Sequence, residues 1–294
     1  MTLRRETWQP GDLFRDFCLW DYRPVTPPDA DTLRHSAFLA ASLDLVPHGR
    51  AVADAFGRIR ERWGAFHTVW GIKSAPTGLS WELYFYDYDR ADRRHGIAAL
   101  ADCLPGFCAP NLAAADEWPW FMFSVEFNEA TVCGAGIPSV DLYFEGDGGT
   151  ISAGLSEVWD GKTRTPKNDY RFYRSGPDRA QVLHDLTGMP PLPAPLEPGR
   201  YGEEVFVISR KSHSSAVYFS RATAEATVRF ARENGFHPGL TETLQPGPKF
   251  TFDATGAATG AAGAAGAAPQ SRHRGAACGP LAIADAHAHH DPPA

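Results

Sequence analysis

Three tyrosines occur in one repeated pattern, in which an aliphatic residue is followed by Tyr and Phe. The pattern appears as Leu83-Tyr84-Phe85, Leu142-Tyr143-Phe144 and Val217-Tyr218-Phe219, and Phe172-Tyr173 is a partial copy. A tyrosine ring attracts cations to its face, and its hydroxyl forms hydrogen bonds. Because side chains alternate between the two faces of a strand, each tyrosine would lie opposite its apolar neighbours. The pattern therefore predicts a tyrosine-lined surface that could hold a small molecule.

Charged residues accompany these tyrosines. Glu82 shares its face with Tyr84, and its carboxylate could act as a general base if it is partly desolvated; the alternative is a Glu that is merely solvated. Arg171 shares a face with Tyr173, and either Arg210 or Lys211 must point to the tyrosine face whichever register holds. The candidate contacts for an anion are therefore Lys73, Arg171, Arg210 and Lys211.

The remaining motifs define neither a metal site nor a cofactor site. Cys103 and Cys108 lack a second ligand pair at zinc spacing, and Gly134-Ala135-Gly136 lacks the strand-to-helix context of a phosphate loop. The ending DAHAHHDPPA could bind a transition metal, but a tail without supporting structure gives only adventitious affinity. We therefore expect no cofactor and no metal.

The elements that position the candidate residues are predicted strand pairs. Period-two patterns predict strands over residues 67–73, 79–89, 120–128, 139–145, 151–159, 169–174, 204–211 and 214–221, with a fifth pair over 240–244 and 249–253. Apolar residues at three- and four-residue spacing predict helices over 32–45, 50–63, 93–103, 179–186 and 223–235.

One face of this sheet is apolar throughout, whereas the other face is polar and rich in tyrosine. The two faces predict an α+β fold: an antiparallel β-barrel, or a strongly curved sheet of about eight to ten strands, built from repeated αββα units with the helices on the outside. The alternative is an open antiparallel sheet whose tyrosines face water, because Tyr is favoured in strands generally.

Composition divides the chain and excludes several classes of protein. We expect an N-terminal segment over 1–30, an α+β barrel-like domain over 31–253 and a disordered Ala/Gly-rich tail over 254–294. The net charge of -7, with no basic cluster longer than Arg90, Arg93 and Arg94, argues against a nucleic-acid partner. No apolar run approaches the ~20 residues that span a bilayer. The start of the chain lacks the apolar region of a secretion signal, so a cytoplasmic location is expected.

Two hairpins resemble those of the bacterial aromatic prenyltransferases of the ABBA (αββα) barrel type. The resemblance lies in Thr68-Val69-Trp70 through Ser74 and Pro76 to Leu79-Ser80 and Phe85, and in His213 to Phe219 with the helix that follows. It implies a ten-stranded antiparallel barrel ringed by helices, in agreement with the fold that the repeated pattern predicts. It also implies an enzyme of secondary metabolism that transfers an isoprenyl group from an allylic diphosphate to a small aromatic acceptor inside the barrel.

The resemblance implies roles for the candidate residues. Glu82 would be the base, and the tyrosines that shield the allylic cation would be Tyr84, Tyr143, Tyr173 and Tyr218. The diphosphate would contact Lys73, Arg171, Arg210 and Lys211.

The chain also departs from this family. Ser212 and Ala216 stand where members often carry Lys and Asn, and Ser139 and Asp141 stand where a Lys and a Tyr would be expected. Carboxylates on the tyrosine face would repel a diphosphate by several kcal/mol at short range. Two alternatives therefore stay open: a non-catalytic small-molecule-binding or accessory protein of a biosynthetic pathway, and an unrelated α+β family.

Overall fold

The computed structural model describes residues 32–33, 35–64, 68–75, 78–87, 93–146, 154–187, 197–211, 214–220, 222–243, 249–250, 254–260 and 274–278. The predicted N-terminal segment over 1–30 lies outside these residues.

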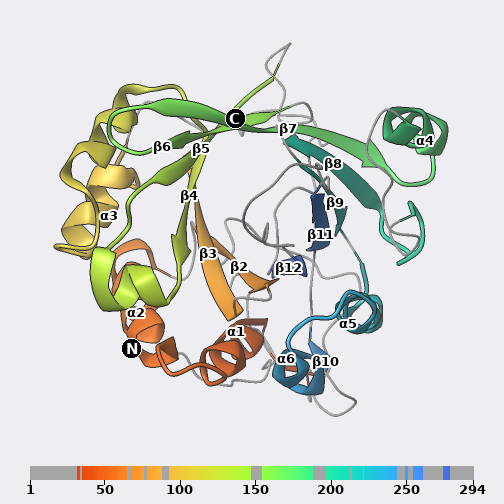
Figure 1. The fold of residues 1–294 in the computed structure, drawn as a ribbon, viewed down its shortest axis with the longest axis horizontal. Helices are drawn as coiled ribbons and strands as arrows, with labels where there is room; N and C mark the ends of the chain where they lie inside the picture. The colour runs from red at the N-terminus through yellow and green to blue at the C-terminus, as the bar shows by residue number, and fades with distance from the viewer. Residues whose placement is uncertain are drawn as a thin grey trace, which may run out of the picture.

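Eight strands form one continuous, curved antiparallel sheet (Figure 1). Each strand pairs with the next in the chain, so the sheet is built from consecutive strand pairs as the sequence predicts. The strands are β2 (Thr68–Ala75), β3 (Gly78–Tyr86), β4 (Met122–Phe127), β5 (Val140–Phe144), β6 (Leu155–Trp159), β7 (Arg164–Arg174), β8 (Val205–Lys211) and β9 (Ser214–Ser220).

Two further strands join the edges of this sheet and close it into a barrel. The strand β11 (Ala254–Gly260) pairs with β9, and β12 (Arg274–Cys278) pairs with both β11 and β2. Both segments fall within the tail over 254–294 that composition predicts to be disordered. Strand pairing needs only backbone N–H and C=O groups, so even Ala and Gly residues can extend an exposed sheet edge. The rest of the predicted tail, 261–273 and 279–294, lies outside the described residues.

The helices lie outside the ring of strands (Figure 1). Their bounds are α1 (His35–Leu43), α2 (Gly49–Trp63), α3 (Ile97–Cys103), α4 (Arg179–Thr187), α5 (Ala224–Glu233) and α6 (Pro238–Thr243), with a 3-10 helix over Pro110–Glu117 and a π-helix over Thr131–Ala135. Gly64 ends α2 at a φ of 81°, a backbone conformation that favours glycine.

The predicted fifth strand pair is wrong. Residues 238–243 form the helix α6, which Pro238 begins at a position where no backbone N–H is needed. The segment β10 (Lys249–Phe250) pairs instead in parallel with β1 (Thr32–Leu33), outside the barrel.

The hydrophobic core fills the space between the outer face of the sheet and the helices. Leu83 and Phe85 of β3 are fully buried there, and the Phe85 ring stacks on Phe123 with the ring centroids 4.6 Å apart. Trp63 of α2 meets Phe85 edge to face at a centroid distance of 5.3 Å. Each such side chain contributes about 1.5–3 kcal/mol when it is fully buried. The apolar residues of the repeated pattern therefore face the helices, which leaves the tyrosines on the inner face.

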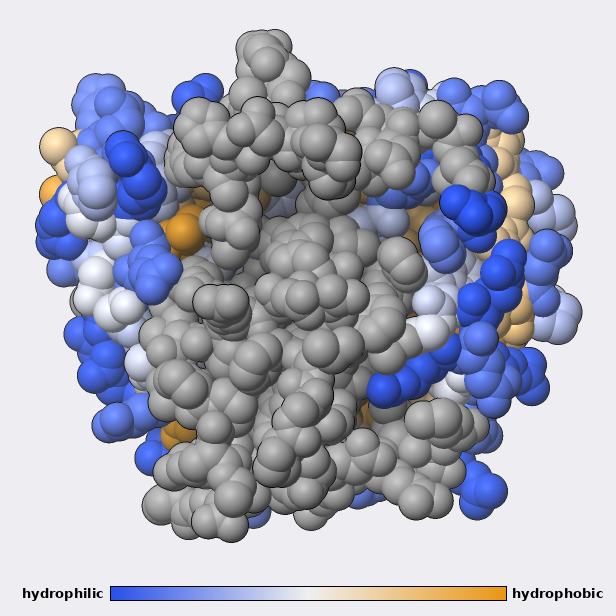
Figure 2. Space-filling view, turned by 180° about the vertical axis from the view of Figure 1, so that it is seen from behind, coloured by the Kyte–Doolittle hydropathy of each residue, from blue (hydrophilic) through white to orange (hydrophobic). Residues whose placement is uncertain are grey.

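The architecture confirms the predicted fold class, an α+β protein with a curved antiparallel sheet and helices outside. On the face shown in Figure 2, the described residues around the periphery are mostly hydrophilic, with few hydrophobic side chains between them. No described helix has the length and apolar character needed to cross a membrane.

Candidate functional site

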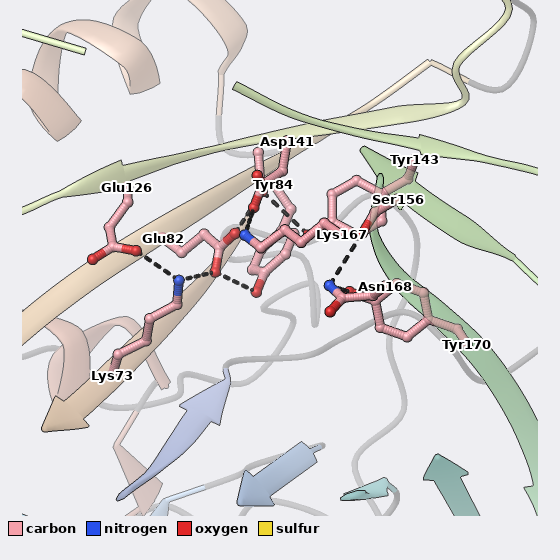
Figure 3. Close-up of polar contacts among 11 residues, drawn as sticks. Lys73, Glu82, Tyr84, Glu126, Asp141, Tyr143, Ser156, Lys167, Asn168 and Tyr170 are labelled. Atoms are coloured by element: carbon pink, nitrogen blue, oxygen red, sulfur yellow. Dashed lines mark hydrogen bonds and ion pairs between the residues drawn. The ribbon is translucent and has the colours of Figure 1, made fainter. Parts of the chain in front are cut away.

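A polar cluster occupies the inner face of the barrel across strands β2 to β7 (Figure 3). The strand register assembles it. Glu82 of β3 pairs with Gly71 on one side and with Glu126 on the other, and Tyr84 pairs with Ser124. Because paired residues of antiparallel strands point to the same face, these side chains converge.

Glu82 lies at the centre of this cluster, with only 4% of its surface exposed. Its Oε2 atom accepts a hydrogen bond from the Tyr84 hydroxyl at 2.9 Å and lies 2.7 Å from Nζ of Lys73. Its Oε1 atom accepts a hydrogen bond from the Ser124 hydroxyl at 2.5 Å. Three neighbours therefore fix the carboxylate in position.

The surroundings of Glu82 keep it ionised. Burial by itself raises the pKa of this carboxyl, but the positive charges of Lys73 and Lys167 and the hydrogen bonds from Lys73 and Ser124 outweigh burial and lower the pKa below its usual value. Burial likewise disfavours the charged form of Lys73, yet Glu82 and Glu126 raise the pKa of its ammonium group. Both members of the pair are therefore charged at neutral pH.

Lys73 bridges two carboxylates. Besides its contact with Glu82, its Nζ atom lies 2.8 Å from Oε2 of Glu126, whose side chain is 44% exposed. The Lys73 side chain itself is 25% exposed. The structure thus places the predicted anion contact Lys73 on the inner face, but already engaged by two carboxylates.

A second ion pair lies beside the first. Lys167 of β7 donates to the Asp141 carboxylate of β5. Burial raises the pKa of Asp141, and Lys167 opposes that shift. Burial also disfavours the charged form of Lys167, but the negative charges of Asp141 and Glu82 raise its pKa above the usual value. Lys167 is a second inward-facing cation that the sequence analysis did not include.

The tyrosines form a continuous aromatic surface beside these pairs. The ring centroids of Tyr84 and Tyr143 are 6.3 Å apart, and those of Tyr143 and Tyr170 are 6.0 Å apart. Burial raises the pKa of the Tyr143 and Tyr170 hydroxyl groups, and the nearby carboxylates Glu82 and Asp141 raise both pKa values further. Both phenols are therefore neutral at physiological pH.

An amide group continues the polar wall beyond the tyrosines. Nδ2 of Asn168 donates to the Tyr170 hydroxyl at 2.7 Å and to the Ser156 hydroxyl at 3.1 Å (Figure 3). Asn168 is buried, with 8% of its surface exposed. Its Oδ1 atom has no hydrogen-bond partner in the part of the chain that the structure describes.

The register places three of the predicted ligand contacts on the opposite, outer face. Arg171 pairs with Ile208, Tyr173 with Phe206 and Arg210 with Asp169, which are all outer-face positions. The Tyr173 hydroxyl donates to Asp185 of α4, and Nη2 of Arg210 donates to the Asp185 carbonyl at 3.1 Å.

The expectation that Arg171, Tyr173 and Arg210 line the interior is therefore wrong. In the partial copy Phe172-Tyr173, Phe172 faces inward and Tyr173 faces outward, which is the reverse of the full pattern. Tyr170, two residues before Phe172, therefore occupies the inner face instead of Tyr173.

Two predicted residues lie at the far side of the barrel from Glu82. Tyr218 of β9 pairs with Val207, on the inner face. Lys211 is the last residue of β8, and its backbone pairs with Asn168; its side chain lies outside the described part of the structure. The structure therefore groups Glu82 with Lys73, Tyr84 and Tyr143, and it leaves the contribution of Lys211 a prediction.

Six members of the cluster were not predicted from the sequence, namely Ser124, Glu126, Ser156, Lys167, Asn168 and Tyr170. The predicted strand begins at residue 169, because the preceding Arg164 to Asn168 is polar and contains Pro166. The structure begins β7 at Arg164, and a register shift next to Pro166 accommodates the proline. Extending the period-two alternation back from Tyr170 to Asn168 would have found both residues.

Neither the described side chains nor their grouping indicates a metal centre. Within the described ranges, no group of three or more His, Cys, Asp or Glu residues is placed to hold a metal ion. The histidines of the C-terminal ending lie outside those ranges.

No known family profile matches this chain, and no curated protein matches it. Among solved structures, the chain is similar to 5-dimethylallyltryptophan synthase from Streptomyces coelicolor, with 9% identity over 85% of this chain and 97% of that chain and a TM-score of 0.46. It is also similar to the apo form of the prenyltransferase PriB, with 11% identity over 82% of this chain and 92% of that chain and a TM-score of 0.46. These proteins are of the class that the sequence resembles, but TM-scores below 0.5 do not establish membership of a family.

Proposed function

We propose that this protein transfers an isoprenyl group from an allylic diphosphate to a small aromatic acceptor at the inner face of the barrel. One observation carries the proposal: the ionised Glu82 is fixed between Lys73 and Tyr84, on a wall that continues through the rings of Tyr143 and Tyr170. The resemblance of two hairpins to aromatic prenyltransferases supports the same reaction.

The tyrosine rings would stabilise the allylic cation. Departure of the diphosphate leaves a carbocation, which the electron-rich faces of Tyr84, Tyr143 and Tyr170 attract. Because burial raises the pKa of Tyr143 and Tyr170, their hydroxyl groups stay protonated. A neutral phenol is a far weaker nucleophile than a phenolate, so the rings can shield the cation without capturing it.

Glu82 would orient the acceptor and then take a proton. An aromatic N–H or O–H that donates to this carboxylate gains electron density in its ring, which favours attack on the allylic carbon. Attack forms a carbon–carbon bond and leaves a positively charged ring that must lose a proton. Such a ring is a strong acid, so a carboxylate with a lowered pKa is a sufficient base.

The diphosphate would be held by lysines that exchange partners. Glu126 is the more exposed of the two carboxylates on Lys73, at 44% against 5% for the Glu82 side chain. A phosphate oxygen could therefore replace Glu126 while Lys73 keeps its contact with Glu82. Lys167 would contribute a second charge-assisted contact from β7.

The second candidate is a non-catalytic protein that binds a neutral or cationic small molecule. Its specific support is the charge balance of the wall, where the carboxylates Glu82, Glu126 and Asp141 engage the ammonium groups of Lys73 and Lys167. A diphosphate must compete with these carboxylates, whereas a cation would meet the tyrosine faces without such competition.

Incubation with dimethylallyl and geranyl diphosphate and a panel of indoles and phenols tests the proposal. Calorimetry measures diphosphate binding, and mass spectrometry detects the prenylated product. We expect saturable binding and a product, loss of the product in Glu82→Gln, and an unchanged rate in Tyr173→Phe, whose hydroxyl bonds to Asp185 on the outer face. Circular dichroism establishes that each variant is folded.

Two results would decide against prenyl transfer. Absence of diphosphate binding at millimolar ligand excludes it. Binding of aromatic cations without diphosphate binding favours the second candidate.

A further inference from the structure

Three buried polar atoms on the inner face have no hydrogen-bond partner among the described residues. They are Oδ1 of Asn168 on β7 and the hydroxyl groups of Ser209 on β8 and Ser220 on β9. Ser220 pairs with Val205 at the other end of these strands, apart from the first two. Asn168 is 8% exposed and Ser209 is 0% exposed. A buried polar group without a partner is unfavourable, so two such groups side by side need an explanation, and a ligand that hydrogen-bonds to both would supply one.

The register places Asn168 and Ser209 next to each other. Ser209 pairs directly with Tyr170, and Tyr170 is two residues from Asn168 on the same face of β7. Asn168 and Ser209 are thus diagonal neighbours on adjacent strands, within the span of one small functional group. Figure 3 shows the Asn168 amide beside Ser156 and Tyr170, on the wall that leads to Lys167.

The nitrogen end of the Asn168 amide holds the side chain in place. Nδ2 donates to the Ser156 and Tyr170 hydroxyl groups, which anchor the side chain. If the amide is turned over, Oδ1 accepts from the same two hydroxyl groups and Nδ2 becomes the atom without a partner. In either orientation, one end of the amide is fixed and the other end has no hydrogen-bond partner among the described residues.

The surroundings favour a neutral ligand group. The described side chains that adjoin the pair on the inner face, Ser156, Tyr170 and Ala216, are uncharged at neutral pH. Lys167, next in sequence to Asn168, is engaged by Asp141. A buried charge without a counter-charge is far more costly than a buried neutral amide with hydrogen bonds.

We propose that Asn168 and Ser209 form a subsite for a neutral carboxamide or lactam carried by the aromatic acceptor. An amide offers both an N–H donor and a C=O acceptor, so it matches the free end of Asn168 in either orientation, and its other group meets the Ser209 hydroxyl. The proposal rests on the proposed function, because it takes the ligand to be the aromatic acceptor of that reaction. Asn168 and Ser209 are specificity-determining residues here, separate from the Glu82 carboxylate.

Three matched indoles test the subsite with the full chain. Indole-3-acetamide, indole-3-acetate and 3-ethylindole share one ring and differ in the group on the side chain. Isothermal titration calorimetry gives the Kd of each probe. We expect the amide to bind at least tenfold more tightly than the other two, because only the amide satisfies both buried groups without adding a charge.

Two substitutions and one control locate the effect. Ser209→Ala and Asn168→Leu should each weaken indole-3-acetamide binding about tenfold and leave the Kd of 3-ethylindole within twofold. Ser215→Ala is the matched control, because Ser215 is a buried serine that pairs with Arg210 on the outer face. Ser209→Ala also removes an unpartnered buried hydroxyl, so its Tm should equal or exceed that of the wild type. A purely structural role for Ser209 predicts a lower Tm and no change in ligand preference.

The outcomes separate the subsite from the proposed function. Equal binding of the three indoles, with prenylated product still formed, overturns the subsite alone. Tight binding of the acetamide without diphosphate binding supports the subsite and overturns prenyl transfer. Preference for the acetate would indicate a cation at this position, from Lys211 opposite Asn168, and would overturn the neutral-ligand proposal. If none of the three indoles binds, the subsite is overturned, and diphosphate binding and product formation with the phenols decide the proposed function separately.

Discussion

Lys73 and Glu82 are diagonal neighbours on β2 and β3, and their charged atoms Nζ and Oε2 lie 2.7 Å apart on the inner face of the barrel. The neighbouring polar groups contact one member of this pair or the other. Tyr84 and Ser124 hydrogen-bond to the carboxylate, and Glu126 contacts the ammonium group. The pair therefore determines both how stable this wall is and how it can meet a ligand.

Removing the charge of Glu82 should destabilise the fold. Glu82→Gln leaves Lys73 with Glu126 alone, and breaking a buried ion pair from one side typically costs 3–5 kcal/mol. Because the Lys73 side chain is 25% exposed, we expect a value near the lower limit, about 3 kcal/mol. Urea unfolding followed by circular dichroism measures the change.

Glu126→Gln provides the comparison, because Glu126 contacts the same ammonium group from an exposed position. We expect it to cost less than about 1 kcal/mol, as is usual for exposed ion pairs. Equal losses in the two variants would show that burial does not distinguish the two carboxylates.

The same pair should make stability depend on pH at both ends of the range. The pKa of Glu82 is lower in the folded protein than its usual 4.5, so its stabilisation is complete above about pH 4.5 and is lost as the pH falls through the folded value. The pKa of Lys73 is higher than its usual 10.5, so its contribution is complete below about pH 10.5 and is lost as the pH rises further.

Unfolding free energies of wild type and Glu82→Gln across pH 3–11 check this. We expect the wild type to exceed Glu82→Gln in unfolding free energy by a constant amount between about pH 5 and 10, and by a smaller amount below about pH 5. A difference that does not change on acidification would mean that Glu82 titrates normally.

The ring of Tyr84 should matter more than its hydroxyl for prenyl transfer. Tyr84→Phe removes the hydrogen bond to Glu82 but keeps the aromatic face, so we expect a rate within about threefold of wild type. Tyr84→Leu removes the face, and a loss of about 1–2 kcal/mol of cation stabilisation slows the reaction about 5- to 30-fold. Single-turnover rates with geranyl diphosphate distinguish the two variants, and similar rates for both would contradict a cation–π role.

Arg93 should be a major stabiliser outside the barrel. Its guanidinium donates to the carbonyl oxygens of Asp116, Trp118 and Trp120 at 3.1, 2.5 and 3.1 Å, and pairs with Asp87 at 3.0 Å. It also lies 3.6 Å from the centre of the Trp120 ring. Arg93→Ala leaves several buried acceptors unpaired and should cost about 3 kcal/mol.

Arg174→Ala is the control for Arg93, because Arg174 is an exposed arginine paired with Asp178 four residues on. Thermal unfolding should show a large decrease in Tm for Arg93→Ala and no measurable change for Arg174→Ala. Comparable decreases would mean that the carbonyl contacts of Arg93 contribute little.

Much of the fold follows from local sequence patterns. The alternation of Leu83, Tyr84 and Phe85 identifies both faces of β3, and the apolar spacing of Val52, Phe56 and Ile59 identifies the buried stripe of α2. These patterns work because each strand has one face against helices and one face against polar groups.

The candidate site was predictable only in part. Glu82, Tyr84 and Tyr143 follow from the repeated pattern, but Tyr173 was assigned to the wrong face because a two-residue copy does not fix the register. Lys167 and Asn168 were missed because Pro166 indicates a loop, whereas a register shift keeps the strand continuous. The partners of each charge depend on which strands become neighbours, and that information is not local.

The closing strands should protect the two edges of the eight-stranded sheet. A chain that ends at residue 253 lacks β11 and β12, which leaves the backbone groups of β2 and β9 unpaired. Exposed strand edges promote association between molecules. Size-exclusion chromatography with light scattering should therefore show oligomers for the truncated chain at concentrations where the full chain is monodisperse.

The junction between β11 and β9 depends mainly on backbone pairing. The strand reads ATGAATG, and it joins β9 over its full length, from Ala254 opposite Ser220 to Gly260 opposite Ser214. Gly-rich strands specify their register weakly, because they have few large side chains whose burial would be lost by a shift of two residues. The shear of the barrel depends on this register, and backbone hydrogen bonds hold it more than side-chain packing does.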